Sequence, residues 1–91
     1  MNYEVRLTTE AENDLRGIFE YIAFELQSPQ NAAGQLDRLE QSIMSLDQMP
    51  ERFRVYEKEP WHSRDLRIMP VDNYLVFYIP NHEEQTVKIM R

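Results

Sequence analysis

Six consecutive bulky apolar or aromatic side chains, "YLVFYI" at residues 74–79, constrain the fold more than any other stretch of the chain. A strand with one solvated face alternates apolar and polar residues, and this run does not alternate. The pattern predicts a central strand that is buried on both faces, with part of its apolar surface available for a partner. We expect "DN" at 72–73 to be a turn from a preceding strand at 66–71, and Pro80 to end the central strand.

The length and composition restrict the class of protein. A chain of 91 residues forms one domain, 1–91, with a radius of gyration of roughly 12 Å if it is compact. No apolar run approaches the ~20 residues that span a bilayer, and "MNYEVRL" at the N-terminus does not resemble a secretory signal. The absence of cysteine excludes disulfides and thiolate metal sites. We therefore expect a cytoplasmic protein without a metal or cofactor.

The first half of the chain predicts a strand followed by a helix. Tyr3, Val5 and Leu7 alternate with charged residues, as in a strand with one wet face. Thr9 with Glu12 three residues later is typical of a capping box, which places the N-cap of the first helix at Thr9. The predicted apolar stripe of this helix consists of Leu15, Ile18, Phe19, Ile22 and Leu26.

A second helix follows after a short connection. Ser28 is the expected N-cap and Pro29 the first helical residue, while Pro50 cannot extend the helix. Its apolar stripe consists of Ala32, Leu36, Leu39, Ile43 and Leu46. A charged loop at 51–65 and a last strand at 86–91 complete the order β-α-α-β-β-β. This order predicts an α+β fold in which a helical hairpin covers one face of a mainly antiparallel four-stranded sheet.

The charge is distributed unevenly. The net charge is −6, and residues 1–50 carry all of it, with three arginines against nine acids. Residues 51–91 hold seven bases and seven acids, and the stretch 52–67 has five bases against three acids, a local excess of +2. The overall acidity argues against general nucleic-acid binding, which needs many basic contacts.

The ordered set of motifs resembles the RelE/ParE superfamily of bacterial type II toxins over nearly the whole chain. The matching stretches are "LTTEAENDLRGIFEYIAFEL", "SPQNAAGQLDRLEQSIMSLDQMPERF", "LRIMPVDNYLVFYI" and "TVKIMR". The resemblance implies a cytoplasmic toxin that a cognate antitoxin neutralises. It also implies one of two activities, mRNA cleavage on the ribosome or poisoning of DNA gyrase.

Cleavage of RNA without a metal requires a proton acceptor, a proton donor and fixed positive charge at the phosphate. In ribonuclease members, such groups lie in the loop before the second strand, on the sheet and after the last strand. The resemblance therefore points to a catalytic set of Arg67, Arg64, Lys58, Arg54 and His62. Two features disagree with this role: "MP" stands at 69–70, where ribonuclease members commonly have an arginine, and the chain stops abruptly at Arg91, which suggests that a C-terminal segment is missing.

Each of these residues also has a structural alternative. Arg67 is either a rigid phosphate-binding group or an ion-pair partner of Asp65 or Asp72. Tyr78 is expected to be a core aromatic residue with a bonded hydroxyl group. Trp61 either stacks on a base or packs under the loop. His62 is either a proton-transfer group or a solvated loop histidine. His82 is either a metal ligand or a histidine in a solvated turn.

Two classes of function follow. In the main reading, the toxin is a metal-independent endoribonuclease whose partners are an antitoxin, the ribosome and mRNA. In the alternative, it is a binding protein: a poison of DNA gyrase, or a toxin fold that binds only its antitoxin.

Overall fold

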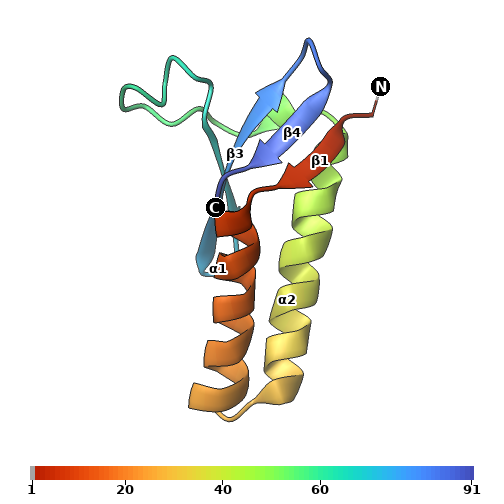
Figure 1. The fold of residues 1–91 in the computed structure, drawn as a ribbon, viewed down its shortest axis with the longest axis vertical. Helices are drawn as coiled ribbons and strands as arrows, with labels where there is room; N and C mark the ends of the chain where they lie inside the picture. The colour runs from red at the N-terminus through yellow and green to blue at the C-terminus, as the bar shows by residue number, and fades with distance from the viewer. Residues whose placement is uncertain (1) are drawn as a thin grey trace.

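The computed structural model describes residues 2–91 and shows the expected element order (Figure 1). The strands are β1 (Glu4–Leu7), β2 (Arg67–Val71), β3 (Tyr74–Asn81) and β4 (Thr86–Ile89). The helices are α1 (Thr9–Glu20) and α2 (Pro29–Met44), and α1 continues as a π-helical turn (Tyr21–Glu25). Two short 3-10 turns, Ser45–Asp47 and Pro50–Arg52, follow α2. The sheet order is β1-β4-β3-β2; β1 runs parallel to β4, and the other neighbours are antiparallel. The predicted α+β class and the mainly antiparallel sheet are confirmed.

Strand β3 lies inside the sheet, but only one of its faces is fully buried. Val76 and Tyr78 are buried on the helix-facing side, whereas Leu75 is 56% exposed and Phe77 is half-buried on the outer side. The expectation of burial on both faces is therefore wrong. On the outer side, Tyr56 from the loop before β2 contacts Phe77 edge to face, with ring centroids 6.2 Å apart.

Pro80 does not end β3, which continues to Asn81. Phe77 exchanges backbone hydrogen bonds with Met90 and Arg91, so alternate residues of β3 direct their backbone groups toward β4. The nitrogen of Pro80 faces the opposite side, where β2 no longer pairs, because the β2–β3 ladder ends at Tyr78. A missing N–H at this position removes no ladder hydrogen bond, and proline is tolerated.

The core lies between the helix-facing side of the sheet and α2. It consists of Ala11, Leu39, Ile43, Leu46, Met69, Val71, Val76, Tyr78, Val87 and Ile89. Tyr78 is fully buried, and its hydroxyl group donates a 2.6 Å hydrogen bond to the Pro50 carbonyl. Burial raises the pKa of Tyr78 to about 12. The prediction of a core aromatic residue with a bonded hydroxyl group is confirmed, and the bond attaches the Pro50–Arg52 turn to the sheet.

The cap of α1 is one residue earlier than predicted. Thr8, not Thr9, is the N-cap, and its Oγ1 accepts a 3.1 Å hydrogen bond from the Ala11 N–H. The same hydroxyl group lies 3.0 Å from the Ile89 carbonyl and thus also connects the helix start to the end of β4. Ser28 is the N-cap of α2 as predicted, but its side chain makes no capping bond, and Pro29 begins the helix.

Because the Thr8 hydroxyl group both caps α1 and bonds to the end of β4, Thr8→Ala is expected to lower the free energy of unfolding by about 1–2 kcal/mol. Thr9→Ala is the matched control and should change stability by only a few tenths of a kcal/mol (~0.3), since Thr9 is an exposed first-turn residue. A urea titration of the three proteins measures both effects. A larger loss for Thr9→Ala than for Thr8→Ala would show that the cap is at Thr9 after all.

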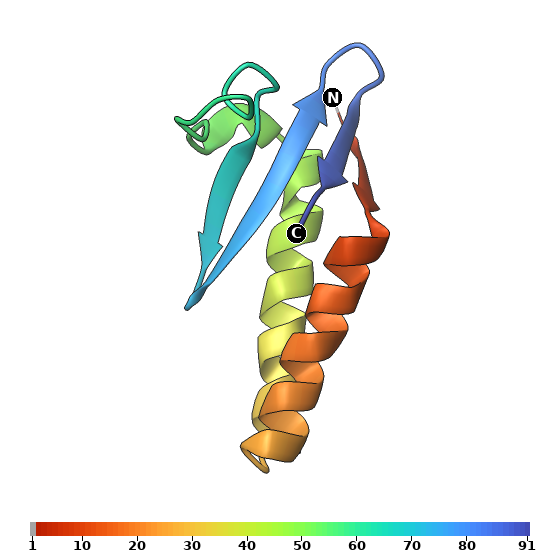
Figure 2. The same ribbon diagram turned by 60° about the vertical axis from the view of Figure 1, so that its left-hand side comes forward.

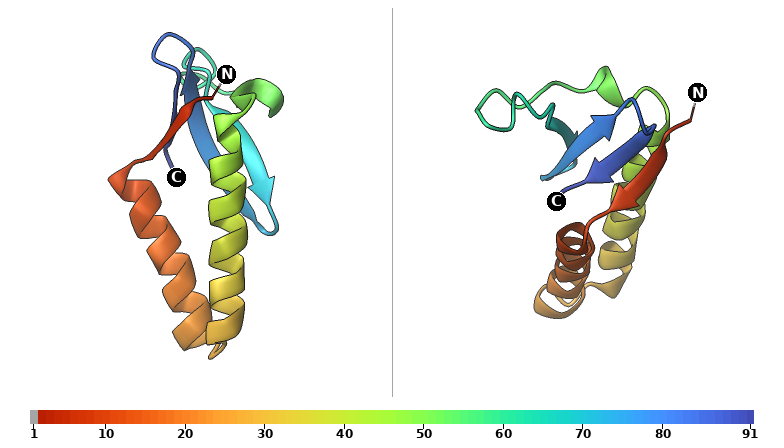
Figure 3. Two further views of the ribbon diagram at one scale, coloured as in Figure 1. Left: turned by 90° about the vertical axis from the view of Figure 1, so that its right-hand side faces the viewer. Right: turned by 45° about the horizontal axis from the view of Figure 1, so that its top comes forward.

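The helical hairpin extends beyond the sheet (Figure 2). The two helices meet at their connection and diverge toward β1 (Figure 3, left). In α1 only Ala11 is buried, and Leu15, Ile18 and Phe19 are half-buried. The molecule is elongated as a result, with a radius of gyration of 13.8 Å. In the described part of the chain, neither helix has the length and apolar character required to cross a membrane.

Candidate functional site

Arg67, the first of the predicted catalytic residues, lies under the loop on the helix-facing side of the sheet. It pairs in register with the buried Tyr78. Its Nη1 donates to the carbonyls of Glu51 and Phe53 at 2.7 and 2.8 Å, and its Nη2 lies 3.0 Å from Asp65 Oδ1. The side chain is only 16% exposed. One guanidinium group thus joins the first and last residues of the 51–65 segment.

The ion pair with Asp65 confirms one of the two structural alternatives for Arg67. The other carboxylate, Asp72, instead accepts a 2.9 Å bond from Arg38 Nε on α2. Three of the five N–H donors of Arg67 are used in these contacts, whereas its Nε is buried and has no hydrogen-bond partner among the described residues.

The other four predicted residues lie in the loop itself. Arg54 and Lys58 line a small hollow of about 140 Å³ beside Ile68. The Arg64 guanidinium lies 5.4 Å from the ring centroid of Trp61, and His62 Nδ1 lies 3.5 Å from Glu59 Oε1 on the exposed surface. Arg54 is close to Arg67 along the backbone, because the neighbouring Val55 forms a bridge with Arg67 and the Arg54 carbonyl accepts a 3.2 Å bond from the Ile68 N–H. The role of the four residues in catalysis stays a prediction.

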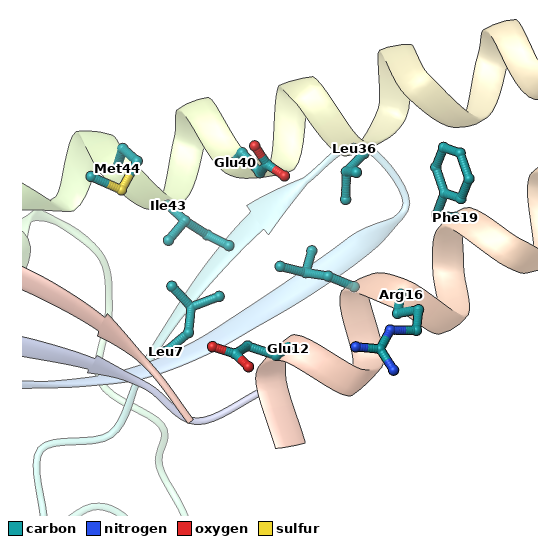
Figure 4. Close-up of a pocket in the computed structure, with 9 residues that line it drawn as sticks. Leu7, Glu12, Arg16, Phe19, Leu36, Glu40, Ile43 and Met44 are labelled. Carbon is teal, nitrogen blue, oxygen red and sulfur yellow. The ribbon is translucent and has the colours of Figure 1, made fainter. Parts of the chain in front are cut away.

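A strongly apolar concave surface lies between the diverging helices and β1 (Figure 4). This groove, called groove 1 below, has a volume of about 550 Å³. Its apolar lining is Leu7, Leu15, Phe19, Leu36, Ile43 and Met44, and its charged residues are Glu12, Arg16 and Glu40. Glu12 on α1 and Glu40 on α2 lie on opposite sides of it (Figure 4).

A second groove, groove 2, lies on the other side of α1, with a volume of about 640 Å³. It is bounded by α1 and by the outer end of the β2–β3 hairpin, and includes Ile18, Tyr21, Tyr74 and Leu75. Gly17 also lines it, and a Cβ added there would meet nothing within 4 Å. Helix α1 therefore has an open apolar groove on each side.

Apolar grooves of this length beside a helix are suited to an amphipathic protein segment rather than to a small polar substrate. Residues 2–91 contain no cluster of three or more His, Asp or Glu side chains that could hold a metal ion. The two grooves are therefore candidate protein-binding surfaces.

Comparison with known families agrees with the sequence motifs. The family model for the ParE toxin of the type II toxin–antitoxin system, parDE, matches residues 5–91. The chain belongs to the ParE toxin family. The resemblance to the RelE/ParE superfamily is therefore confirmed, and the matching family within it is ParE.

A solved structure shares the ParE fold of this chain. It is described as the chromosomal ParDE TA system from P. aeruginosa and matches with a TM-score of 0.77 and 16% sequence identity. The match covers 98% of this chain and 91% of that one. No curated protein sequence matches the chain.

Sequence reasoning did not find the grooves, because it assigned the helix stripes to the core first. Leu15, Phe19 and Leu36 belong to the predicted stripes, but they line groove 1. One signal was available in the sequence. Aromatic residues at 19, 21 and 24 widen the apolar surface of the first helix beyond the single stripe that one contact needs.

Proposed function

We propose that this ParE-family toxin acts in the cytoplasm as a poison of DNA gyrase and that a cognate antitoxin neutralises it. The observation that carries the proposal is the match to the ParE family model over residues 5–91. Of the two activities implied by the superfamily resemblance, gyrase poisoning is the one associated with ParE. Ribosome-dependent cleavage of mRNA, the main reading of the sequence, has less support.

The placement of the predicted catalytic residues also favours binding over catalysis. Cleavage of RNA requires an acid, a base and a cation around one phosphate. Arg67 is on the helix-facing side of the sheet with its guanidinium bound to Asp65 and two carbonyls. Arg64, in contrast, stands beside Trp61 in the loop. A poison needs no such constellation, because it acts by holding its target in one state.

We propose groove 1 as the antitoxin site. Its walls are apolar, and two helices with a gap between them can receive a third amphipathic helix. Glu12 and Glu40 flank the gap. A matching antitoxin segment would therefore carry apolar residues at helical spacing together with a lysine or arginine that meets these carboxylates.

Expression of the toxin in cells distinguishes the two activities. With gyrase as the target, induction is expected to stop growth with broken chromosomal DNA, while the lengths of cellular mRNAs stay unchanged. Expression together with the product of the adjacent reading frame, where the antitoxin of a two-gene module is encoded, should restore growth. Shortened mRNAs with intact chromosomes would contradict the proposal and support the ribonuclease reading.

A further inference from the structure

The outer face of the sheet, opposite the helices, carries a cleft that the proposed function does not use. Its volume is about 610 Å³, and strands β1, β3 and β4 form it together with the loop before β2. Three cations from three different elements line it: Arg6 from β1, Lys88 from β4 and Arg64 from the loop. We call this the outer cleft.

The two strand cations of the outer cleft lie side by side. Arg6 and Lys88 are direct neighbours in the parallel β1–β4 register, and like charges at such positions repel. Glu4 bonds to Arg6 at 2.8 Å, but Lys88 has no ion-pair partner among residues 2–91. In a chain with a net charge of −6, an unpaired cation beside another cation indicates a site for an anion.

An exposed aromatic ring lies in the same cleft. Trp61 is the single tryptophan of the chain and is 37% exposed. The ring is thus partly covered, and both of its predicted roles, stacking on a base and packing under the loop, stay predictions. The Arg64 guanidinium lies over the ring, and Ile79 and Met90 add apolar surface to the same cleft. A partly exposed indole ring beside cations is suited to single-stranded nucleic acid, because a base can stack on the ring while phosphates meet the cations.

We propose that the outer cleft binds a single-stranded nucleic-acid segment, with one base stacked on Trp61 and the adjacent phosphates at Lys88 and Arg6. Two acids limit the strength of this site, since Glu4 competes for Arg6 and Glu84 also lines the cleft. The inference goes beyond the proposed function. It does not require gyrase for its own test.

The test uses the purified toxin and a 12-nucleotide oligothymidylate. Because Trp61 is the sole tryptophan, stacking of a base is expected to quench the intrinsic fluorescence of the protein. Binding to a fluorescein-labelled copy of the same oligonucleotide, measured by anisotropy, gives affinities for all variants. Lys88→Gln is expected to weaken binding about fivefold and to lower the slope of log affinity against log salt by about 0.7. Trp61→Ala should weaken binding about tenfold.

Arg38→Gln is the matched control. It removes one positive charge from the exposed side of α2, where Arg38 bonds to Asp72 and lies outside the outer cleft, so a change of less than twofold is expected. Equal losses for Arg38→Gln and Lys88→Gln would show nonspecific attraction and overturn the inference. The absence of quenching would also overturn it, as would equal affinity for a 12-base-pair duplex, whose base faces are hidden.

The outcomes separate this inference from the proposed function. If the toxin binds the oligonucleotide through Trp61 and Lys88 but does not affect gyrase, the inference stands and the gyrase proposal fails. If the toxin poisons gyrase but shows no oligonucleotide binding at the outer cleft, the gyrase proposal stands and this inference fails.

Discussion

Arg67→Ala is expected to lower the free energy of unfolding by about 3 kcal/mol, because a largely buried charged group makes several hydrogen bonds that nothing replaces. The substitution removes the donors to the Glu51 and Phe53 carbonyls and leaves Asp65 without its cation. It also disconnects the 51–65 segment from β2. A urea titration followed by circular dichroism measures the loss. For a domain of 60–100 residues, the midpoint temperature should fall by roughly 12 °C or more.

Two further variants make the Arg67 experiment specific. Arg67→Lys keeps the charge but cannot reach two carbonyls and a carboxylate at once, so it should recover less than half of the lost stability. Arg38→Ala breaks the exposed pair with Asp72 and should leave stability nearly unchanged. If Arg67→Ala unfolds at the wild-type urea concentration and yet abolishes toxicity, the arginine is a phosphate-binding group, as the sequence also allowed.

Phe19→Ala is expected to weaken antitoxin binding by about 30-fold or more, which corresponds to a loss of ~2 kcal/mol at a binding hot spot. Phe19 lines groove 1 from the α1 side and is half-buried in the free toxin. A partner helix in the groove would cover the rest of its ring. The affinity of the purified toxin for the product of the adjacent reading frame, measured by isothermal titration calorimetry, tests this expectation.

Phe24→Ala is the control for the groove. Phe24 is 71% exposed in the turn that follows α1 and lines neither groove 1 nor groove 2. Its loss should leave the affinity within about twofold of wild type. A stronger effect at Phe24 than at Phe19 would place the antitoxin on the end of the hairpin and exclude groove 1 as the main site.

The order of helices and strands could be predicted from the sequence because the hydrophobic period changes clearly between strands and helices. The cap of α1 could not. Two threonines stand side by side, and the local rule favours Thr9, which has Glu12 three residues later. Thr8 is the cap because its hydroxyl group also reaches the end of β4, a contact 81 residues away in the sequence. Tertiary structure decided between two locally similar choices.

The placement of the site residues depends on similar long-range facts. In a strand, a shift of one residue moves a side chain to the opposite face, so the side of the sheet on which Arg67 lies follows from its pairing with Tyr78. The apolar run at 74–79 was interpreted as doubly buried because a sequence does not distinguish a covered face from an open one. The stripe of the second helix predicted its buried residues Ala32, Leu39, Ile43 and Leu46 correctly. The stripe of the first helix is only partly buried, with Leu26 57% exposed, and neither stripe predicted the grooves on either side of α1.

The most direct test of the proposed function is a reaction of purified toxin with purified gyrase, relaxed plasmid and ATP. The expected result is linear plasmid that accumulates after the gyrase is denatured and digested, in proportion to the amount of toxin. Addition of the antitoxin should prevent it, and programmed ribosomes incubated with the same toxin should retain intact mRNA. Cleaved mRNA on the ribosome, together with unaffected supercoiling by gyrase, would contradict the proposal.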